Sequence, residues 1–213
     1  MNNFIVSFFP GSSGRFISNV IWRMITEMDS YIPLDENNSA HPVSSWGNSC
    51  HHPYGILHDS SIYKNVKFDD IGLLATHSYP DFDAIRVSLP QVKVVIIGIT
   101  EDVIPEVAAN SITKNRNTTR NANEKTVHLK WLFNMYKKGN TRGSFFTNFC
   151  DPDLIPEDLR DRISILYYRD IYTKVNDSYV ALEHLKKITG KDALPNVMRS
   201  YEAYVQARNC NFG

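Results

Sequence analysis

A glycine- and serine-rich loop near the N-terminus carries residue types that bind anions. Residues 11–16, GSSGRF, follow a short apolar run and precede an apolar pattern with helical spacing. Glycines let the backbone curl so that several N–H groups converge, and a following helix adds the positive end of its dipole. The hydroxyls of Ser12 and Ser13 and the guanidinium of Arg15 are further donors. The predicted anion-binding residues are Gly11, Ser12, Ser13, Gly14, Arg15 and Phe16.

The same loop is also compatible with a plain strand-to-helix turn that uses Pro10 and Gly11. It lacks the Walker A pattern, because no lysine follows Gly14 and only two residues separate the two glycines. The loop therefore predicts an anion site of another kind, with the plain turn as the alternative.

A histidine at the end of a predicted strand is the candidate general base. His77 lies near the carboxyl end of the apolar run 71–79. In parallel sheets, such ends gather at the edge where ligands bind. A neutral imidazole takes a proton from a hydroxyl nucleophile near pH 7. The alternative is a histidine that is hydrogen-bonded to nearby backbone.

Basic residues are densest in the stretch 114–121, KNRNTTRN. Lys114, Arg116 and Arg120 are candidates to wrap a phosphate group, and a solvated polar loop is the alternative. The CHHPYG stretch at 50–55 has neighbouring ligand-type residues but no second cluster at metal-ligand spacing, so we expect no metal site.

The apolar runs alternate with helical patterns along the chain. The predicted strands cover 4–9, 71–79, 92–100 and 162–171, and predicted helices begin near 15 and cover about 101–112, 122–138, 179–190 and 195–208. This alternation predicts a three-layer α/β sandwich with a mostly parallel central sheet. Residues 29–61 show little periodicity and predict a long irregular connection. We expect a single domain over residues 1–213.

Composition excludes some classes of function. A chain of 213 residues with 42% hydrophobic and 22% charged residues is typical of a globular protein. A formal net charge of zero argues against a nucleic-acid or acidic-membrane surface as the partner. Three scattered cysteines and no long apolar segment lead us to expect a cytoplasmic protein.

Four segments in order resemble the sulfotransferases that use 3′-phosphoadenosine 5′-phosphosulfate (PAPS). They are FFPGSSGRFISNVIW, LLATHSYPDF, VKVVIIGITEDVIPEVAANS, and ILYYRDIY with the later YVALEHLKKITG. The family reads strand, Pro-Lys-Ser-Gly-Thr-Thr, helix at the first segment, Lys-Thr-His-x-Pro at the second and Val-Ile-x-Arg-Asn-Pro-x-Asp at the third. The resemblance extends from about residue 4 to residue 190 and implies a P-loop-like sulfotransferase fold.

The resemblance implies roles for single residues. Ser13 and Gly14 fall on the family's Ser-Gly, and His77 falls on its catalytic histidine. Gly98 stands where the family has the arginine that binds the 3′-phosphate, and Glu106 stands where it has the serine that shares this task.

Several departures from the family pattern need compensation. Ser12 stands where many members have a basic residue, and Arg15 is the candidate to supply that charge. Ala75 replaces the lysine two residues before the histidine. The candidates to replace the missing phosphate arginine are Ser111, Lys114, Arg116 and Arg120.

The resemblance therefore implies a sulfotransferase-like protein that binds PAPS as co-substrate and needs no metal. The acceptor would be a hydroxyl on a small molecule or a glycan. One alternative is a P-loop kinase-like phosphotransferase. Another is a non-catalytic binding or assembly module that kept the fold.

Overall fold

Four parallel strands form the central sheet of the protein. The computed structural model describes residues 2–9, 11–34, 71–76, 80–107, 110 and 155–209. The strands are β1 (Asn2–Ser7), β2 (Ile71–Thr76), β3 (Val92–Gly98) and β4 (Ile163–Tyr167). They lie in the order β2-β1-β3-β4, and every neighbouring pair is parallel.

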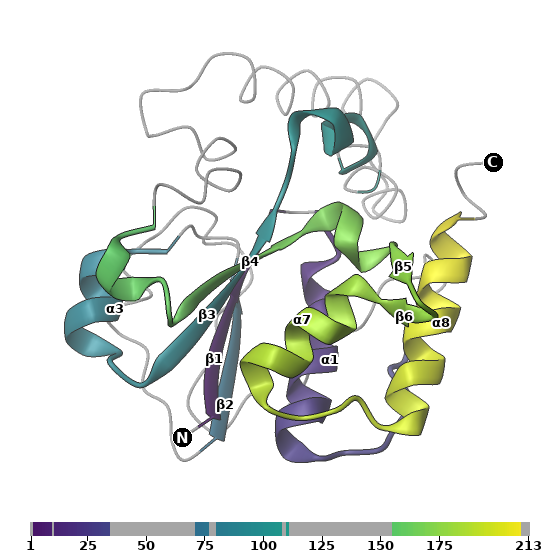
Figure 1. Cartoon of the computed structure of the whole chain (residues 1–213), viewed down its shortest axis with the longest axis horizontal. Helices are drawn as coiled ribbons and strands as arrows, with labels where there is room; N and C mark the ends of the chain where they lie inside the picture. Colours follow the sequence, from purple (N-terminus) through teal and green to yellow (C-terminus); the bar gives the residue numbers. More distant parts are fainter. Residues whose placement is uncertain are drawn as a thin grey trace, which may run out of the picture.

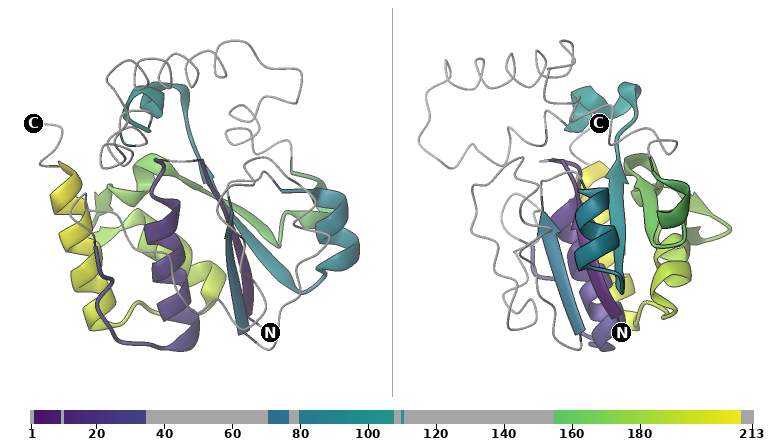
Figure 2. Two further views of the ribbon diagram at one scale, coloured as in Figure 1. Left: turned by 180° about the vertical axis from the view of Figure 1, so that it is seen from behind. Right: turned by 90° about the vertical axis from the view of Figure 1, so that its left-hand side faces the viewer.

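Helices cover both faces of this sheet. Helices α1 (Gly14–Thr26), α7 (Val180–Thr189) and α8 (Pro195–Asn209) lie on one side, and the short helix α3 (Phe82–Ser88) lies on the other (Figure 1). The left view of Figure 2 shows the same separation from behind. The expected layered α/β architecture with a parallel sheet is confirmed.

Strand β3 explains why two hydrophobic layers form. Its side chains alternate between the faces, and Val94, Val95, Ile96 and Ile97 are all fully buried. Val95 and Ile97 join the core under α1, α7 and α8, whereas Val94 and Ile96 join the core under α3. A continuous β-branched run is therefore the pattern of a central parallel strand.

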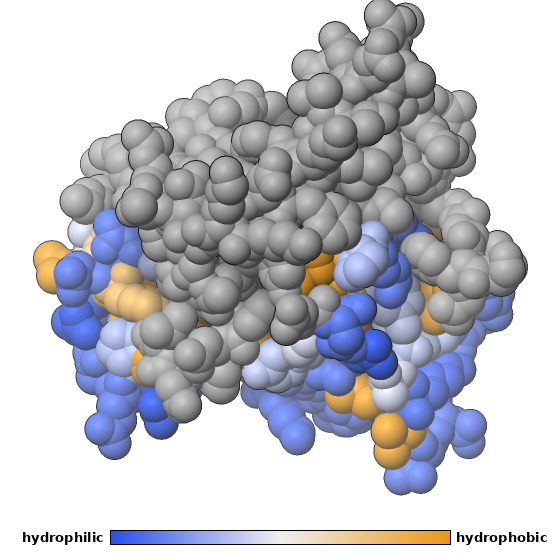
Figure 3. All heavy atoms as spheres, turned by 90° about the horizontal axis from the view of Figure 1, so that it is seen from above, coloured by the Kyte–Doolittle hydropathy of each residue, from blue (hydrophilic) through white to orange (hydrophobic). Residues whose placement is uncertain are grey.

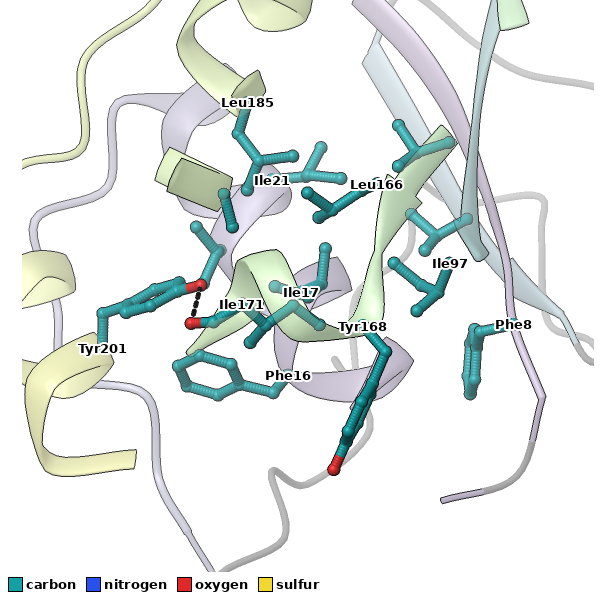
Figure 4. Close-up of a cluster of buried hydrophobic side chains, with 14 of the residues drawn as sticks. Phe8, Phe16, Ile17, Ile21, Ile97, Leu166, Tyr168, Ile171, Leu185 and Tyr201 are labelled. Carbon is teal, nitrogen blue, oxygen red and sulfur yellow. Dashed lines mark hydrogen bonds between the residues drawn. The ribbon is translucent and has the colours of Figure 1, made fainter. Parts of the chain in front are cut away.

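The larger core ends in a group of aromatic rings. Figure 4 shows aliphatic side chains of α1, β4 and α7 packed together, with the rings of Phe8, Phe16 and Tyr168 at one end of the cluster. This end of the core adjoins the carboxyl ends of the strands, because Phe8 follows β1 and Tyr168 follows β4.

The strand order creates a switch point beside β1. The chain passes from β1 to β2 on one side and then to β3 on the other side of β1. Ligands of open parallel sheets bind outside the carboxyl ends of the strands at such a reversal. Figure 3 looks onto this end of the molecule, where the described side chains that are visible are mainly hydrophilic with a few apolar ones between them.

Several elements differ from their predicted bounds. Strand β1 begins at Asn2 and ends at Ser7, so the predicted 4–9 run continues into the loop as buried Phe8 and Phe9. The predicted strand 162–171 ends at Tyr167, and a 3₁₀-helix, η4 (Tyr168–Ile171), follows it. A 3₁₀ turn places residues three apart on one side, which buries both Tyr168 and Ile171.

Other elements were not predicted from the sequence. Helix α3 begins after Asp81, whose carboxylate accepts a hydrogen bond from the Ala84 N–H. Strands β5 (Lys174–Val175) and β6 (Ser178–Tyr179) form a small hairpin, and the two residues of its turn both have positive φ. By contrast, the helix predicted over about 101–112 is confirmed in part: η1 (Glu101–Val103) is a 3₁₀-helix, residues 104–107 and 110 are helical, and 108, 109, 111 and 112 lie outside the described residues.

The predicted helices α7 and α8 are confirmed. Helix α7 ends where Gly190 adopts a left-handed conformation with φ of 72°. The predicted helix 122–138 and most of the irregular segment 29–61 lie outside the described residues. No helix in the described ranges combines the length and apolar character needed to cross a membrane.

Candidate functional site

The loop after β1 has the backbone conformation of an anion-binding nest. Gly11 has φ of 93°, and Ser13 lies in the left-handed region with φ of 66° and ψ of 9°. Gly14 then begins α1 in the right-handed conformation. Adjacent left- and right-handed residues turn successive N–H groups toward one side, and the first-turn N–H groups of a helix have no intrahelical acceptor. This geometry suits a phosphate or sulfate oxygen.

A close approach to Phe8 explains the glycine at position 14. A Cβ atom on Gly14 would lie 1.9 Å from Cγ of the Phe8 ring. The loop therefore folds back over the ring of the residue that leaves β1, and any larger residue at position 14 must displace this ring. The Phe8 N–H donates to the Thr76 carbonyl over 3.0 Å, which ties the start of the loop to the end of β2.

The hydroxyl of Ser12 stabilises the loop from within. It donates to the Phe9 carbonyl over 2.6 Å, and the Ser12 N–H donates to the same oxygen over 3.1 Å. Its single hydroxyl hydrogen is thus used inside the protein rather than on a ligand. One turn further along, Ser18 donates to the Gly14 carbonyl over 2.6 Å and closes the first turn of α1.

Two tyrosines hold the hydroxyl of Ser13. Tyr204 of α8 donates a hydrogen bond to Ser13 Oγ over 2.7 Å, and the Tyr172 hydroxyl lies 2.7 Å from the same atom. The Tyr204 ring also stacks on Phe16, with ring centroids 3.7 Å apart and an interplanar angle of 6°. Burial raises the pKa of Tyr172 well above its ordinary value, so this phenol stays protonated. These contacts keep Ser13 in a left-handed conformation that residues other than glycine rarely adopt.

The structure therefore brings residues 11–16 together as one unit. Arg15 is half-buried, and its carbonyl accepts a hydrogen bond from the Asn19 side chain over 2.9 Å. The other predicted site residues, His77, Ser111, Lys114, Arg116 and Arg120, lie outside the described residues. Thr76, which precedes His77, pairs with Ser7 at the carboxyl end of β1.

A second polar cluster lies at the same edge, after β3 and β4. The Arg208 Nη1 donates to Asn110 Oδ1 over 2.7 Å, and Asn110 Nδ2 donates to the Tyr168 hydroxyl over 2.9 Å. The Tyr168 hydroxyl donates in turn to Glu106 Oε1 over 2.7 Å. Burial is the main cause that raises the pKa of Tyr168 far above its ordinary value, so its phenol remains neutral.

Arg208 is buried without enough acceptors. The residue is 4% exposed, and its Nε and Nη2 atoms have no hydrogen-bond partner among the described residues. No ion pair of the described residues includes it. Leaving one buried donor unpaired costs about 1–3 kcal/mol, and more for a charged group. The negative end of the α8 dipole offsets only about 0.3–1 kcal/mol of this cost.

The second buried arginine shows what full pairing looks like. Arg23 is 8% exposed, and each of its three nitrogens donates: Nε to the Ser30 carbonyl, Nη1 to Asn19 Oδ1 and Nη2 to the Tyr31 carbonyl, all over 3.0 Å. Arg208 has one such bond. The contrast shows that the packing of this protein satisfies one buried guanidinium and leaves the other incomplete.

Sequence reasoning missed Arg208, although a signal was present. Val197, Tyr201, Tyr204, Val205 and Arg208 recur at three- and four-residue spacing and are all buried on α8. A cation on the apolar side of a helix either has a buried partner or binds a ligand.

Gly98 offers only backbone at the end of β3, where it pairs with Tyr167. Nearby, Arg169 and Asp102 form an exposed ion pair. A hydrogen bond from Thr100 and the charge of Arg169 hold the pKa of Asp102 below its ordinary value despite some desolvation. Arg169 is thus already paired and is less suited than Arg208 to bind an added anion.

Within the described ranges, no group of three or more histidine, cysteine, aspartate or glutamate side chains is placed to hold a metal ion. No protein-family model matches the chain, and no curated protein and no solved structure matches it significantly. A functional assignment therefore depends on the chemistry of the residues at the carboxyl edge of the sheet.

Proposed function

We propose that this protein is a sulfotransferase-like enzyme that transfers a sulfuryl group from PAPS to a hydroxyl acceptor. The observation that carries the proposal is the nest at Ser13 and Gly14, which opens helix α1 at the switch point of a parallel sheet. Four motifs in order resemble the PAPS-dependent family, and this resemblance is the reason for proposing PAPS as the donor.

The chemistry assigns a role to each part of the site. His77 removes the proton of the acceptor hydroxyl, whose oxygen attacks the sulfur of the donor. The bond between sulfur and the bridging oxygen of the 5′-phosphate breaks, leaving a sulfate ester and adenosine 3′,5′-bisphosphate, with the proton on His77. The N–H groups of the loop and the Arg15 guanidinium stabilise the charge that builds on the leaving phosphate.

The Ser12 and Ser13 hydroxyls act mainly by shaping this loop. Both are almost completely buried, and both are engaged by protein groups. Backbone donors that are already in place need no reorganisation when the charge develops, which is the advantage of a preorganised site.

The Ser12 and Ser13 hydroxyls also support a second candidate function, that of a binding or assembly module without catalytic activity. A loop whose serines are occupied by Phe9, Tyr172 and Tyr204 also suits a non-catalytic module that kept the fold. Such a module would not turn over PAPS, so a turnover assay separates the two functions.

Titration calorimetry of the full chain tests the proposal. Adenosine 3′,5′-bisphosphate should bind without Mg²⁺, and Mg²⁺-ATP should not compete for the site. Ser13→Gly keeps the left-handed backbone but removes the clamped hydroxyl, so it should bind more weakly. Ser200→Ala is the matched control, because it removes a buried serine hydroxyl that contacts Ile32 instead of the loop.

Three results would contradict the proposal. Tight binding of Mg²⁺-ATP alone would favour the kinase-like alternative. Binding of the bisphosphate without release of sulfate ester from PAPS and a panel of hydroxyl acceptors would favour the non-catalytic module. No binding of either nucleotide would remove the nucleotide assignment altogether.

A further inference from the structure

Two of the unpaired donors of Arg208 lie along one edge of its guanidinium. In arginine, the Nε–H and one N–H of Nη2 are parallel and form a fork that matches two oxygens of a carboxylate, sulfate or phosphate group. Within the described part of the chain, these are the two nitrogens of Arg208 that lack a partner, whereas Nη1 donates to Asn110.

This protein already uses the same fork elsewhere. In Arg86, Nε donates to Asp158 Oδ2 over 2.7 Å and Nη2 donates to Oδ1 over 3.0 Å. That pair lies at the surface, where water competes with it. The fork of Arg208 is almost completely buried, so an anion placed there would meet far less competition from water.

The surroundings of Arg208 hold its side chain in position without neutralising it. Asn110 binds Nη1, and the Tyr204 ring lies 5.5 Å from Cζ. Tyr168 and Tyr172 are neutral phenols. Among the described residues, hydrogen bonds connect Arg208 to the carboxylate of Glu106 through Asn110 and Tyr168, not directly.

We propose that the Nε and Nη2 edge of Arg208 is a ligand site for an oxyanion, a sulfate or phosphate group that donates two oxygens to the fork. Tyr204 joins this site to the loop, because its ring faces Arg208 and its hydroxyl binds Ser13. The proposal extends the anion site to a residue of the last helix and does not depend on which nucleotide the loop binds.

Sulfate, with sodium chloride at equal ionic strength as the reference, is the first probe. The NMR signal of the Arg208 Nε–H is identified by its absence in Arg208→Lys. Sulfate should shift this signal saturably and raise the unfolding temperature. Arg208→Lys keeps the charge but loses the fork, and Arg208→Met loses both, so each should bind sulfate at least tenfold more weakly.

Two control variants keep the experiment specific. Arg199→Gln removes a cation from an exposed position of the same helix and should bind sulfate like the wild type. Arg23→Met removes the fully paired buried arginine and should lower the unfolding temperature without anion. Arg208→Met should lower it much less in sulfate-free buffer, because the guanidinium that it removes has one hydrogen bond, to Asn110, and no counter-ion among the described residues.

The source of the anion is decided by comparing probes on the same signal. A shift produced by adenosine 3′,5′-bisphosphate at much lower concentration than sulfate assigns the site to an esterified phosphate. A shift produced by sulfate alone assigns it to the inorganic anion.

The inference is overturned if sulfate and bisphosphate both leave the Arg208 signal unchanged. It is equally overturned if Arg208→Met lowers the unfolding temperature in sulfate-free buffer as much as Arg23→Met does, because the fork would then be paired within the chain itself. Equal binding of bisphosphate by wild type and Arg208→Met would leave the proposed function intact and remove this site. A sulfate response without any bisphosphate binding would support the Arg208 site and contradict the proposed function.

Discussion

The hydroxyl of Tyr204 donates a hydrogen bond to the hydroxyl of Ser13, 191 residues earlier in the chain. Ser13 is the residue whose left-handed backbone begins the nest, and Tyr204 belongs to the last helix. The conformation of the candidate anion loop is therefore set in part by a helix that packs beside it. Tyr172, which follows β4, holds the same oxygen from a second direction.

Tyr204→Phe should lower both the stability of the protein and its affinity for the nucleotide. The ring keeps its stacking on Phe16, and only the hydrogen bond to Ser13 is lost, which lowers the free energy of unfolding by about 0.5–1.5 kcal/mol. Affinity for adenosine 3′,5′-bisphosphate should fall by up to about tenfold, because the nest is less well held. Urea unfolding and calorimetry measure the two effects.

Tyr201→Phe is the matched control for that substitution. Its hydroxyl donates to the Ile171 carbonyl over 2.9 Å and does not touch the loop (Figure 4). It should lose comparable stability and keep its affinity. Equal affinities of the two variants would contradict a role of Tyr204 in shaping the loop.

Gly14→Ala should destabilise the protein by about 1–3 kcal/mol, because its Cβ atom overlaps the Phe8 ring. Removing the ring in Phe8→Ala should relieve part of this cost, because the Phe8 Cγ and Cδ atoms that overlap the new Cβ atom are then absent. A double-mutant cycle should therefore show a coupling of at least about 0.5 kcal/mol. Chemical denaturation of the four proteins measures this coupling.

Gly190→Ala serves as a comparison for Gly14→Ala. Nothing lies within 4 Å of a Cβ atom at Gly190, and the cost there comes only from its positive φ. Phe8→Ala should not reduce that cost. Additive effects of Gly14→Ala and Phe8→Ala would mean that the overlap with the ring is not what destabilises Gly14→Ala.

His184 should make the protein less stable as the pH falls. Burial lowers the pKa of His184, while Asp170 opposes and Lys187 assists this shift, and its Nε2 contacts Ser164 Oγ. The folded state then binds fewer protons than the unfolded state near the unfolded pKa of about 6.5, so the free energy of unfolding rises with pH in this range. Denaturant midpoints should therefore drop from pH 8 to pH 5, and less steeply in His184→Gln. An identical drop in the variant would exclude His184 as the cause.

His77→Gln should abolish turnover while donor binding persists. Loss of a general base lowers the rate by about 10²- to 10⁴-fold. The Kd for adenosine 3′,5′-bisphosphate should stay unchanged, because the histidine acts on the acceptor. His184→Gln provides a control for the loss of an imidazole elsewhere. Undiminished turnover in His77→Gln would assign the base to another residue.

Replacing Lys114, Arg116 and Arg120 with alanine tests whether this stretch supplies the charge missing at Gly98. If it does, affinity for adenosine 3′,5′-bisphosphate should fall much more than affinity for adenosine 5′-phosphate. One lost charge-assisted hydrogen bond corresponds to about 1.5–3 kcal/mol, or roughly ten- to a hundredfold in affinity. Equal losses for the two nucleotides would argue against this role.

Local sequence patterns were sufficient to predict the layered architecture. The β-branched run of β3 predicts a strand buried on both faces, and Gly190 marks the end of α7, since both signals act within a few residues. The glycine spacing located the loop in the same way. The role of Gly14 was not predictable, because it depends on the Phe8 ring folding back over the loop.

The sequence by itself determined the alternation of strands and helices, the parallel sheet, and the place of the loop between β1 and α1, because hydrophobic periodicity and glycine positions are local properties. Only the tertiary structure decided that β4 ends at Tyr167, that Tyr204 and Tyr172 hold Ser13, and that Arg208 is left with an unpaired fork. The physical reason is that a buried polar group depends on its partners, and these partners come from α8 and from the segments that follow β1, β3 and β4, which are far apart in the chain and adjacent only after folding.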